Sequence, residues 1–133
     1  MQKNTIMKEK LKAYIQLIRI PLFPIPIVTT LSGVALASEG NVTWRGYLVL
    51  VVSMLGYFAG MMKNDYFHSE TDAVVNPDKP IPSGRIPRKE VLVLASTTYI
   101  VCIILGMIIN IKTGLLVMLL IVISHLYNAM FKA

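Results

Sequence analysis

The chain has 133 residues, of which 55% are hydrophobic and 15% are charged, with a mean hydropathy of +0.63. Soluble domains carry about 25% charged residues, so this composition argues against a soluble globular protein and for a single membrane domain over residues 1–133. The net charge of +6 does not indicate a nucleic-acid partner, because the bases lie at the ends of apolar segments and form no stripe with aromatic residues. Cys102 is the one cysteine, so no disulfide framework is expected.

Four segments free of Lys, Arg, Asp and Glu are each long enough to cross a membrane. A helix needs roughly 17–25 residues to cross a hydrocarbon layer ~30 Å thick, and none of these segments has the polar face of a soluble helix. The expected spans are residues 20–37, 46–62, 91–109 and 114–131. We therefore predict an all-α fold, a polytopic bundle of four transmembrane helices.

The first span begins in an unusual way. It follows a lysine-rich segment and ends in Ala-Leu-Ala at 35–37, as a cleaved signal peptide would. Pro21, Pro24 and Pro26 interrupt its start, however, and the basic segment before it is long. We therefore interpret it as a retained helix with a bent entry, where neighbouring groups satisfy the freed carbonyls.

The bases predict the orientation of the bundle. If the N-terminus is cytoplasmic, the outside loops hold Arg45 and Lys112 and the inside segments hold the other bases, a strong positive-inside bias. The inside bases are Lys3, Lys8, Lys10, Lys12, Arg19, Lys63, Lys79, Arg85, Arg88, Lys89 and Lys132. We expect an integral protein of the cell inner membrane, with both termini and a loop at residues 63–90 in the cytoplasm.

The segment 63–90 holds five of the seven carboxylates of the chain. If the second helix continues into it, residues three and four apart are neighbours. Asn64, His68 and Asp72 then line one stripe, with Asp65 and Ser69 beside it. This arrangement predicts a polar pocket at the membrane surface, with a merely solvated loop as the alternative.

Oxygen ligands of this kind suit Mg²⁺, which commonly bridges a carboxylate to substrate phosphates. Lys79 and Arg85 follow in a stretch rich in turn-forming residues, "NPDKPIPSGRIP" at 76–87. We expect this stretch to be an ordered loop that folds back and offers cations to a phosphate group.

Two stretches carry a resemblance to a known family. "NDYFHSETD" at 64–72, followed by "NPDKPIPSGRI" at 76–86, resembles the first aspartate-rich motif, N-D-x-x-D-x-x-x-D, of the UbiA-type intramembrane prenyltransferases. This family includes 4-hydroxybenzoate polyprenyltransferase and its relatives. "LIRIPLFPIP" at 17–26 is similar to the entry of the family's first helix, R-x-P-N. The family also carries its motif on the cytoplasmic side between the second and third helices.

The resemblance implies transfer of a prenyl group from an isoprenyl diphosphate to an aromatic or other lipophilic acceptor within the lipid bilayer. It implies that Asn64, Asp65 and Asp72 hold Mg²⁺, with Asp65 and Asp72 as the catalytic carboxylates. Asn64, Lys79 and Arg85 would contact the diphosphate. The metal would stabilise charge that develops on the departing oxygen.

The chain also departs from the family pattern. His68 stands where the middle aspartate belongs and is a poor Mg²⁺ ligand, and Leu22 stands where R-x-P-N has asparagine. The family has about nine helices and a second aspartate-rich motif, whereas no Asp or Glu follows Glu90. We expect the N-terminal half of such an enzyme, which needs a separate C-terminal half or a homo-oligomer. The alternative is an inactive, degenerate four-helix protein with a structural or partner-binding role.

Overall fold

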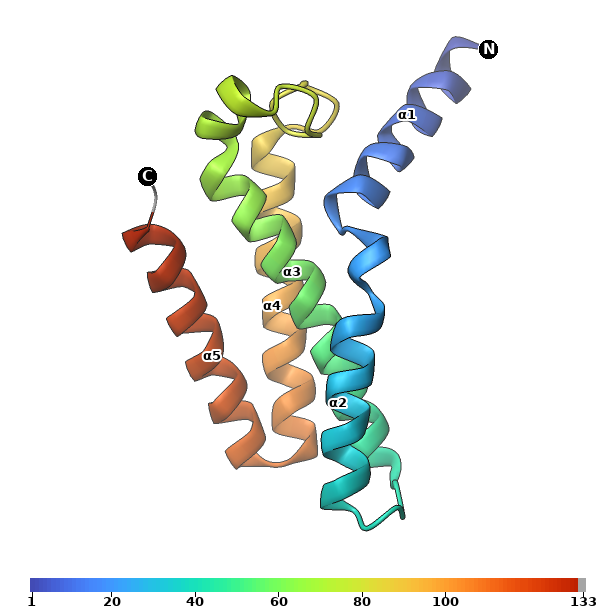
Figure 1. Cartoon of the computed structure of the whole chain (residues 1–133), viewed down its shortest axis with the longest axis vertical. Helices are drawn as coiled ribbons and strands as arrows, with labels where there is room; N and C mark the ends of the chain where they lie inside the picture. The colour runs from blue at the N-terminus through green and yellow to red at the C-terminus, as the bar shows by residue number, and fades with distance from the viewer. Residues whose placement is uncertain (132–133) are drawn as a thin grey trace.

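The computed structural model describes residues 1–131, which form helices joined by short connections (Figure 1). The elements are α1 (Gln2–Leu17), a 3-10 turn η1 (Ile20–Leu22), α2 (Pro24–Ala37), α3 (Trp44–Val75), α4 (Arg88–Ile109) and α5 (Ile111–Met130). The described residues contain no strand, so the all-α prediction is confirmed. Lys132, counted above among the inside bases, lies outside the described residues.

Three helices, α3, α4 and α5, are long and apolar enough to cross a membrane. The segment from α1 to η1 and the helix α2 form a fourth candidate span when they are taken as one pair, bent by 50°. The prediction of a membrane-spanning bundle is therefore confirmed, with three or four spans. The 14 residues of α2 are fewer than the roughly 17–25 that a crossing requires.

The bend before α2 has a local cause. Pro21 and Pro24 lack the backbone N–H that a continuous helix needs and clash with the preceding turn. Arg19, immediately before η1, has a φ of 51° in the left-handed region, which ends the regular helix. The proline-rich entry therefore forms a short 3-10 turn between two helices.

Helix α3 is longer than the predicted span 46–62. It has 32 residues, about 48 Å at 1.5 Å per residue, which exceeds a hydrocarbon layer of ~30 Å. No glycine or proline lies between Gly60 and Pro77, and the helix ends at Val75, just before the residue that precedes Pro77. The segment 63–90 is thus a helical extension followed by a loop over residues 76–87, and the polar residues project beyond the apolar part of α3.

Helices α4 and α5 form a close antiparallel hairpin whose bounds lie within three residues of the predicted spans 91–109 and 114–131. Asn110 connects them, and its side-chain oxygen accepts a hydrogen bond of 2.9 Å from the backbone N–H of Thr113. A Cβ atom at Gly106 would lie 3.1 Å from the Cα atom of Gly114. The two helices can approach this closely because both contact positions are glycine.

The N-terminal helix α1 was not among the predicted elements. Its buried residues Ala13 and Leu17 join an apolar cluster with Met62 of α3 and Val91 of α4. Lys10 and Tyr14 both donate hydrogen bonds to the Glu90 carboxylate at the start of α4. These contacts fix α1 against the end of the bundle that carries the polar segment.

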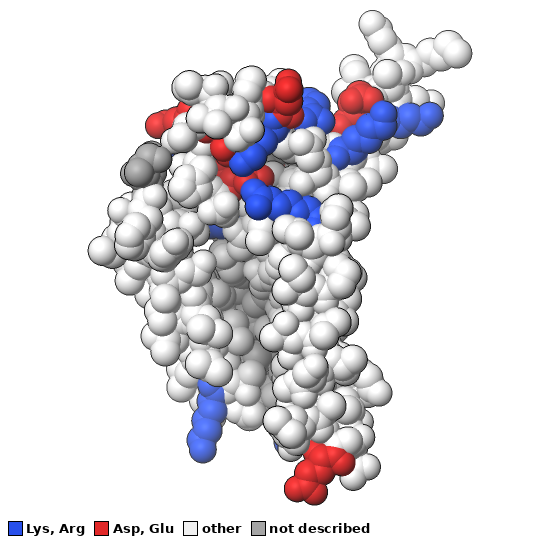
Figure 2. Space-filling view, viewed as in Figure 1, with Lys and Arg blue, Asp and Glu red and all other residues white. Residues whose placement is uncertain are grey.

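Charged side chains gather at that end, where α1, the last turns of α3 and the loop 76–87 meet (Figure 2). Below them the surface is almost free of charge, and large apolar side chains such as Leu115, Leu119 and Ile123 of α5 are about half exposed. Exposed apolar side chains on long helices are expected where lipid surrounds the protein.

Candidate functional site

Three polar side chains lie on one buried face of the extension of α3. Asp65 is 5% exposed, Ser69 is 6% exposed and Asp72 is 8% exposed. Seven residues turn a helix through about 700°, close to two full turns, so Asp65 and Asp72 share a face. The extension lies beyond the predicted span 46–62, at the charged end of the bundle.

The buried stripe differs from the predicted one. Asn64 and His68 are half-buried, while Asp65 and Ser69, expected beside the stripe, form it with Asp72. The reason is angular, because the eight residues from Asn64 to Asp72 turn about 800° and overshoot two turns by about 80°. Asn64 is therefore turned away from the face of the two aspartates, whereas His68, at spacings of three and four from Asp65 and Asp72, lies at the edge of that face and is half-buried.

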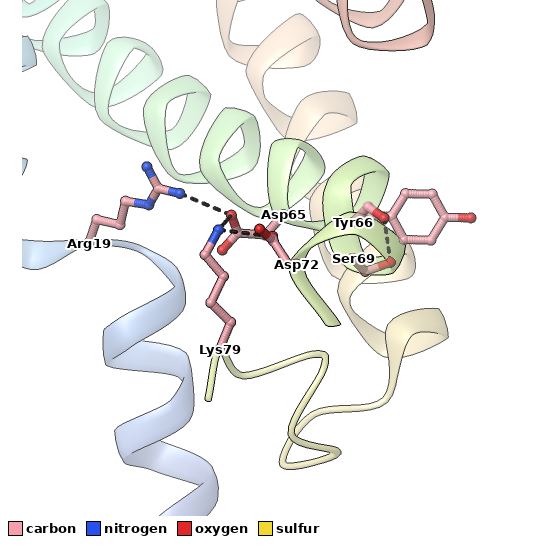
Figure 3. Close-up of polar contacts among 6 residues, drawn as sticks. All are labelled: Arg19, Asp65, Tyr66, Ser69, Asp72 and Lys79. Carbon is pink, nitrogen blue, oxygen red and sulfur yellow. Dashed lines mark hydrogen bonds and ion pairs between the residues drawn. The ribbon is translucent and has the colours of Figure 1, made fainter. Parts of the chain in front are cut away.

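Two cations from distant parts of the chain meet these carboxylates (Figure 3). The Arg19 Nη2 atom lies 3.0 Å from Asp65 Oδ1. The Lys79 Nζ atom lies 2.9 Å from Asp72 Oδ2 and 3.7 Å from Asp65 Oδ1. We call Arg19, Asp65, Asp72 and Lys79 the aspartate cluster. Its four formal charges sum to zero.

Burial and the neighbouring cations shift the pKa of Asp65 in opposite directions. Removal from water disfavours the carboxylate and raises the pKa of Asp65, and the nearby Lys79 and Arg19 cations offset part of that rise. The carboxylate is thus costly to bury and is held by charge-assisted contacts to both cations. A ligand that draws either cation away from Asp65 must supply a replacement positive charge.

The loop 76–87 holds Lys79 beside the two aspartates because apolar residues of the loop are buried. Pro80, Ile81 and Ile86 are buried, and Gly84 adopts a φ of 75°, which glycine reaches without strain. The backbone N–H of Ser83 donates to the Lys79 carbonyl. The loop therefore folds back over α3, as its turn-forming residues predict.

Arg85 does not join the aspartate cluster. Its Nη2 atom donates to the Gln16 side-chain oxygen at 2.8 Å and to the Asp78 carbonyl at 2.6 Å. Arg85 thus ties the loop to α1. Sequence reasoning did not select Arg19 as a site residue, although it stands in the stretch 17–26 that resembles the entry of the family's first helix.

The two carboxylates of the cluster fit a Mg²⁺ ion whose other ligands come from the substrate and from water. Among residues 1–131, no group of three or more His, Cys, Asp or Glu side chains is close enough to form a metal site. Mg²⁺, however, is often held by one or two carboxylates together with substrate phosphates and water. Asp65 and Asp72, which share the Lys79 ammonium, offer the two carboxylates that such an arrangement needs.

Comparisons with known proteins identify relatives of this chain. A sequence model of the UbiA prenyltransferase family matches residues 27–133. The chain is 39% identical over 92 residues to a digeranylgeranylglyceryl phosphate synthase of Pyrococcus abyssi, which is 68% of this chain and 33% of the relative. It is 31% identical over 123 residues to the synthase of Ignicoccus hospitalis, which is 92% of this chain and 40% of the relative.

The chain is also 34% identical over 84 residues to the synthase of Methanosphaera stadtmanae, which is 61% of this chain and 31% of the relative. It therefore spans well under half the length of these relatives. No solved structure matches it. The family match covers most of the chain and includes the helical extension with Asp65 and Asp72. The chain therefore belongs to the UbiA prenyltransferase family.

Proposed function

We propose that this chain supplies the first diphosphate-binding half-site of a membrane prenyltransferase. The observation that carries the proposal is the aspartate cluster, in which two buried carboxylates on one face of α3 meet two cations, one from the connection between α1 and η1 and one from the loop. Family membership supports the reaction class. Because the chain spans only part of its relatives, transfer itself is proposed for the whole assembly, with a separate C-terminal half or a second copy completing the site.

Asp65 and Asp72, with the neighbouring Asn64 amide, would hold Mg²⁺. Prenyltransferases of this family generally use Mg²⁺ to bind diphosphate. When bound, the ion would neutralise diphosphate charge and act as a Lewis acid toward the leaving oxygen. The neutral charge sum of the cluster implies that the metal and the diphosphate bind together, since each compensates the charge of the other.

The cations would then contact the diphosphate. Lys79 and Arg19 are already at the carboxylates, and phosphate oxygens accept charge-assisted hydrogen bonds from both side-chain types. Arg85, bound to Gln16 and to the Asp78 carbonyl, would reach the ligand only by leaving these partners. We therefore propose Arg19 as a diphosphate contact ahead of Arg85.

In the proposed reaction, the bond between the allylic carbon and the diphosphate oxygen breaks and its electron pair leaves with the diphosphate. A nucleophilic atom of the acceptor forms a bond to that carbon and loses its proton. The relatives named above are synthases of digeranylgeranylglyceryl phosphate, so a lipophilic acceptor that bears a glyceryl phosphate is the proposed class. The aspartate cluster would face the cytoplasm of the cell, at its inner membrane.

Equilibrium binding tests the half-site without requiring turnover. We expect the purified chain in nanodiscs to bind farnesyl diphosphate in the presence of Mg²⁺ and to lose at least tenfold in affinity with excess EDTA. Asp65→Asn and Asp72→Asn should each produce a similar loss. Asp78→Asn is the matched control, because the Asp78 side chain is exposed and outside the cluster.

Two results would contradict the proposal. Binding that is equally tight in the variant with both Asp65→Asn and Asp72→Asn would place the diphosphate elsewhere. Absence of any Mg²⁺-dependent binding would favour the inactive, degenerate protein over the half-site.

A further inference from the structure

The outward face of α1 is both apolar and basic. Met7, Leu11 and Ile15 follow one another at spacings of four, so they form one stripe along the helix. These side chains are 65%, 61% and 44% exposed. Lys8 and Lys12 each follow a member of the stripe by one residue, about 100° around the helix axis, so both lysines flank the stripe on the same side.

This outward face is separate from the face of α1 that packs on the bundle. Ala13 and Leu17 are buried in the apolar cluster with residues of α3 and α4, and Tyr14 donates a hydrogen bond to Glu90. Leu11 lies two residues before Ala13, about 200° around the helix axis. The packing of residues 1–131 therefore leaves the outward face of α1 uncovered.

The apolar stripe continues into the surface of the segment that enters the membrane. Ile15 lines an open notch of about 460 Å³ together with Lys12 and with Pro21 and Leu22 of η1. Leu22 is 41% exposed, and Ile25 in the first turn of α2 is 63% exposed. The outward face of α1 is thus continuous with exposed apolar side chains of the first candidate span.

The bend before α2 inclines α1 toward the membrane plane. The segment Gln2–Leu22 makes an angle of 50° with α2, and Figure 1 shows α1 leaning away from the other helices. Spanning helices are tilted on average by about 20° from the bilayer normal. Added to the bend, such a tilt brings α1 to within about 20° of the membrane plane, the orientation of a helix that lies along the headgroup layer.

The charges of α1 favour a negatively charged lipid surface. The helix carries four lysines and one carboxylate. Lys10 and Lys12 each pair with a carboxylate, whereas Lys3 and Lys8 form no ion pair within residues 1–131. Anionic lipids attract basic segments beside a membrane span, and an apolar stripe next to the lysines adds burial in the interface.

We propose that α1 is a membrane-docking helix, whose outward face rests on the anionic surface of the bilayer that the bundle spans. Met7, Leu11 and Ile15 enter the interface, and Lys8 and Lys12 contact the charged headgroups. The partner is the lipid surface as a whole, and it is neither the diphosphate nor the acceptor of the proposed function. The inference goes beyond that function, because docking does not depend on what the aspartate cluster binds.

Spin labels on two sides of α1 test the docking in the full chain. In a Cys102→Ser background, Leu11→Cys carries a label on the outward face, and Glu9→Cys carries the matched control about 200° away. Both positions are exposed, so neither label should disturb the fold. In vesicles of equal parts phosphatidylcholine and phosphatidylglycerol, the ratio of oxygen to water-soluble nickel collisions should be at least threefold higher at Leu11 than at Glu9.

The dependence on charge tests the anionic partner. In phosphatidylcholine alone, or at high salt, the ratio at Leu11 should fall toward that at Glu9. Lys8→Gln combined with Lys12→Gln should have the same effect in the mixed vesicles. Lys89→Gln combined with Lys112→Gln is the control of equal net charge, because both lysines are exposed and lie outside α1, and it should leave the ratio unchanged.

Three results would overturn the inference. The first is an equal collision ratio at Leu11 and Glu9 in the mixed vesicles, which would place the outward face in water. The second is a high ratio at Leu11 that is the same in neutral and anionic vesicles. The third is magnetic broadening between Leu11 labels of different chains, which would assign the face to a second copy.

Discussion

Arg19 shows how one strained residue can connect two parts of the bundle. Its φ of 51° costs a residue with a Cβ atom about 1–2 kcal/mol, and such strain persists only where surrounding contacts enforce it. Here the Tyr57 hydroxyl donates to the Arg19 carbonyl at 3.3 Å, and the guanidinium reaches Asp65 at 3.0 Å. The strained turn before η1 therefore delivers a cation from the N-terminal segment to α3.

Removal of the Arg19 side chain should destabilise the chain through Asp65. In Arg19→Ala, the buried carboxylate keeps Lys79 alone, at 3.7 Å, and we expect the free energy of unfolding in detergent to fall by about 1–3 kcal/mol. The loss should shrink when Asp65→Asn is already present, because no buried charge then needs a partner. Arg45→Ala, at the opposite end of the bundle, is the control. If the losses of free energy for Arg19→Ala and Asp65→Asn add in the double variant, the two side chains are not coupled.

The composition of the aspartate cluster was predictable in part. Helical spacing and the motif pointed to Asp65 and Asp72, and the turn-forming residues pointed to a loop that brings Lys79 back to them. Spacing along one helix carries no information on partners from other segments, so the contact between Arg19 and Asp65, 46 residues apart, was not predicted. Arg85 is predicted as a diphosphate contact from its charge and from the family resemblance, and its partners in the structure, Gln16 and the Asp78 carbonyl, depend on how α1 packs.

At the scale of the helices, the bounds that were hardest to predict are those set by something other than apolar length. Hydropathy located α4 and α5 to within three residues because the apolar runs and the helices have nearly the same bounds. It ended the second span at Met62, although the backbone of α3 remains helical to Val75. A polar sequence without glycine or proline can continue a helix into water, and an apolar sequence with three prolines can interrupt one.

The hairpin of α4 and α5 depends on glycine at one contact. A Cβ atom on Gly114 would lie 2.3 Å from Met107 Sδ and 2.9 Å from the Met107 backbone nitrogen. The side chain can move but the backbone cannot, so Gly114→Ala should separate the two helices and lower the free energy of unfolding by about 1–3 kcal/mol.

Gly33→Ala provides the matched control for this prediction. Gly33 lies within α2, and a Cβ atom there meets nothing within 4 Å. The substitution should be neutral or stabilise α2 by up to about 1 kcal/mol, since alanine favours a helix over glycine. Equal thermal stability of the two variants in detergent would show that the hairpin does not require the close contact.

The whole molecule is polarised along its long axis. The aspartate cluster, the loop 76–87 and α1 lie at one end (Figures 1 and 2), and the apolar lengths of α3, α4 and α5 lie between this end and the other. Because positively charged loops remain in the cytoplasm, the same polarity that builds the candidate site also predicts its side of the membrane.

Cysteine accessibility tests that orientation. Asn41, in the turn between α2 and α3, and Ser83, in the loop 76–87, are both exposed and lie at opposite ends of α3. In a Cys102→Ser background, a membrane-impermeant maleimide should label Asn41→Cys in intact cells and Ser83→Cys only after the membrane is permeabilised. The reverse pattern would place the aspartate cluster outside the cell, away from a cytoplasmic supply of diphosphate. Labelling of both positions in intact cells would mean that α3 does not cross the membrane. The prediction of a bundle with its polar end at the cytoplasmic surface would then be wrong.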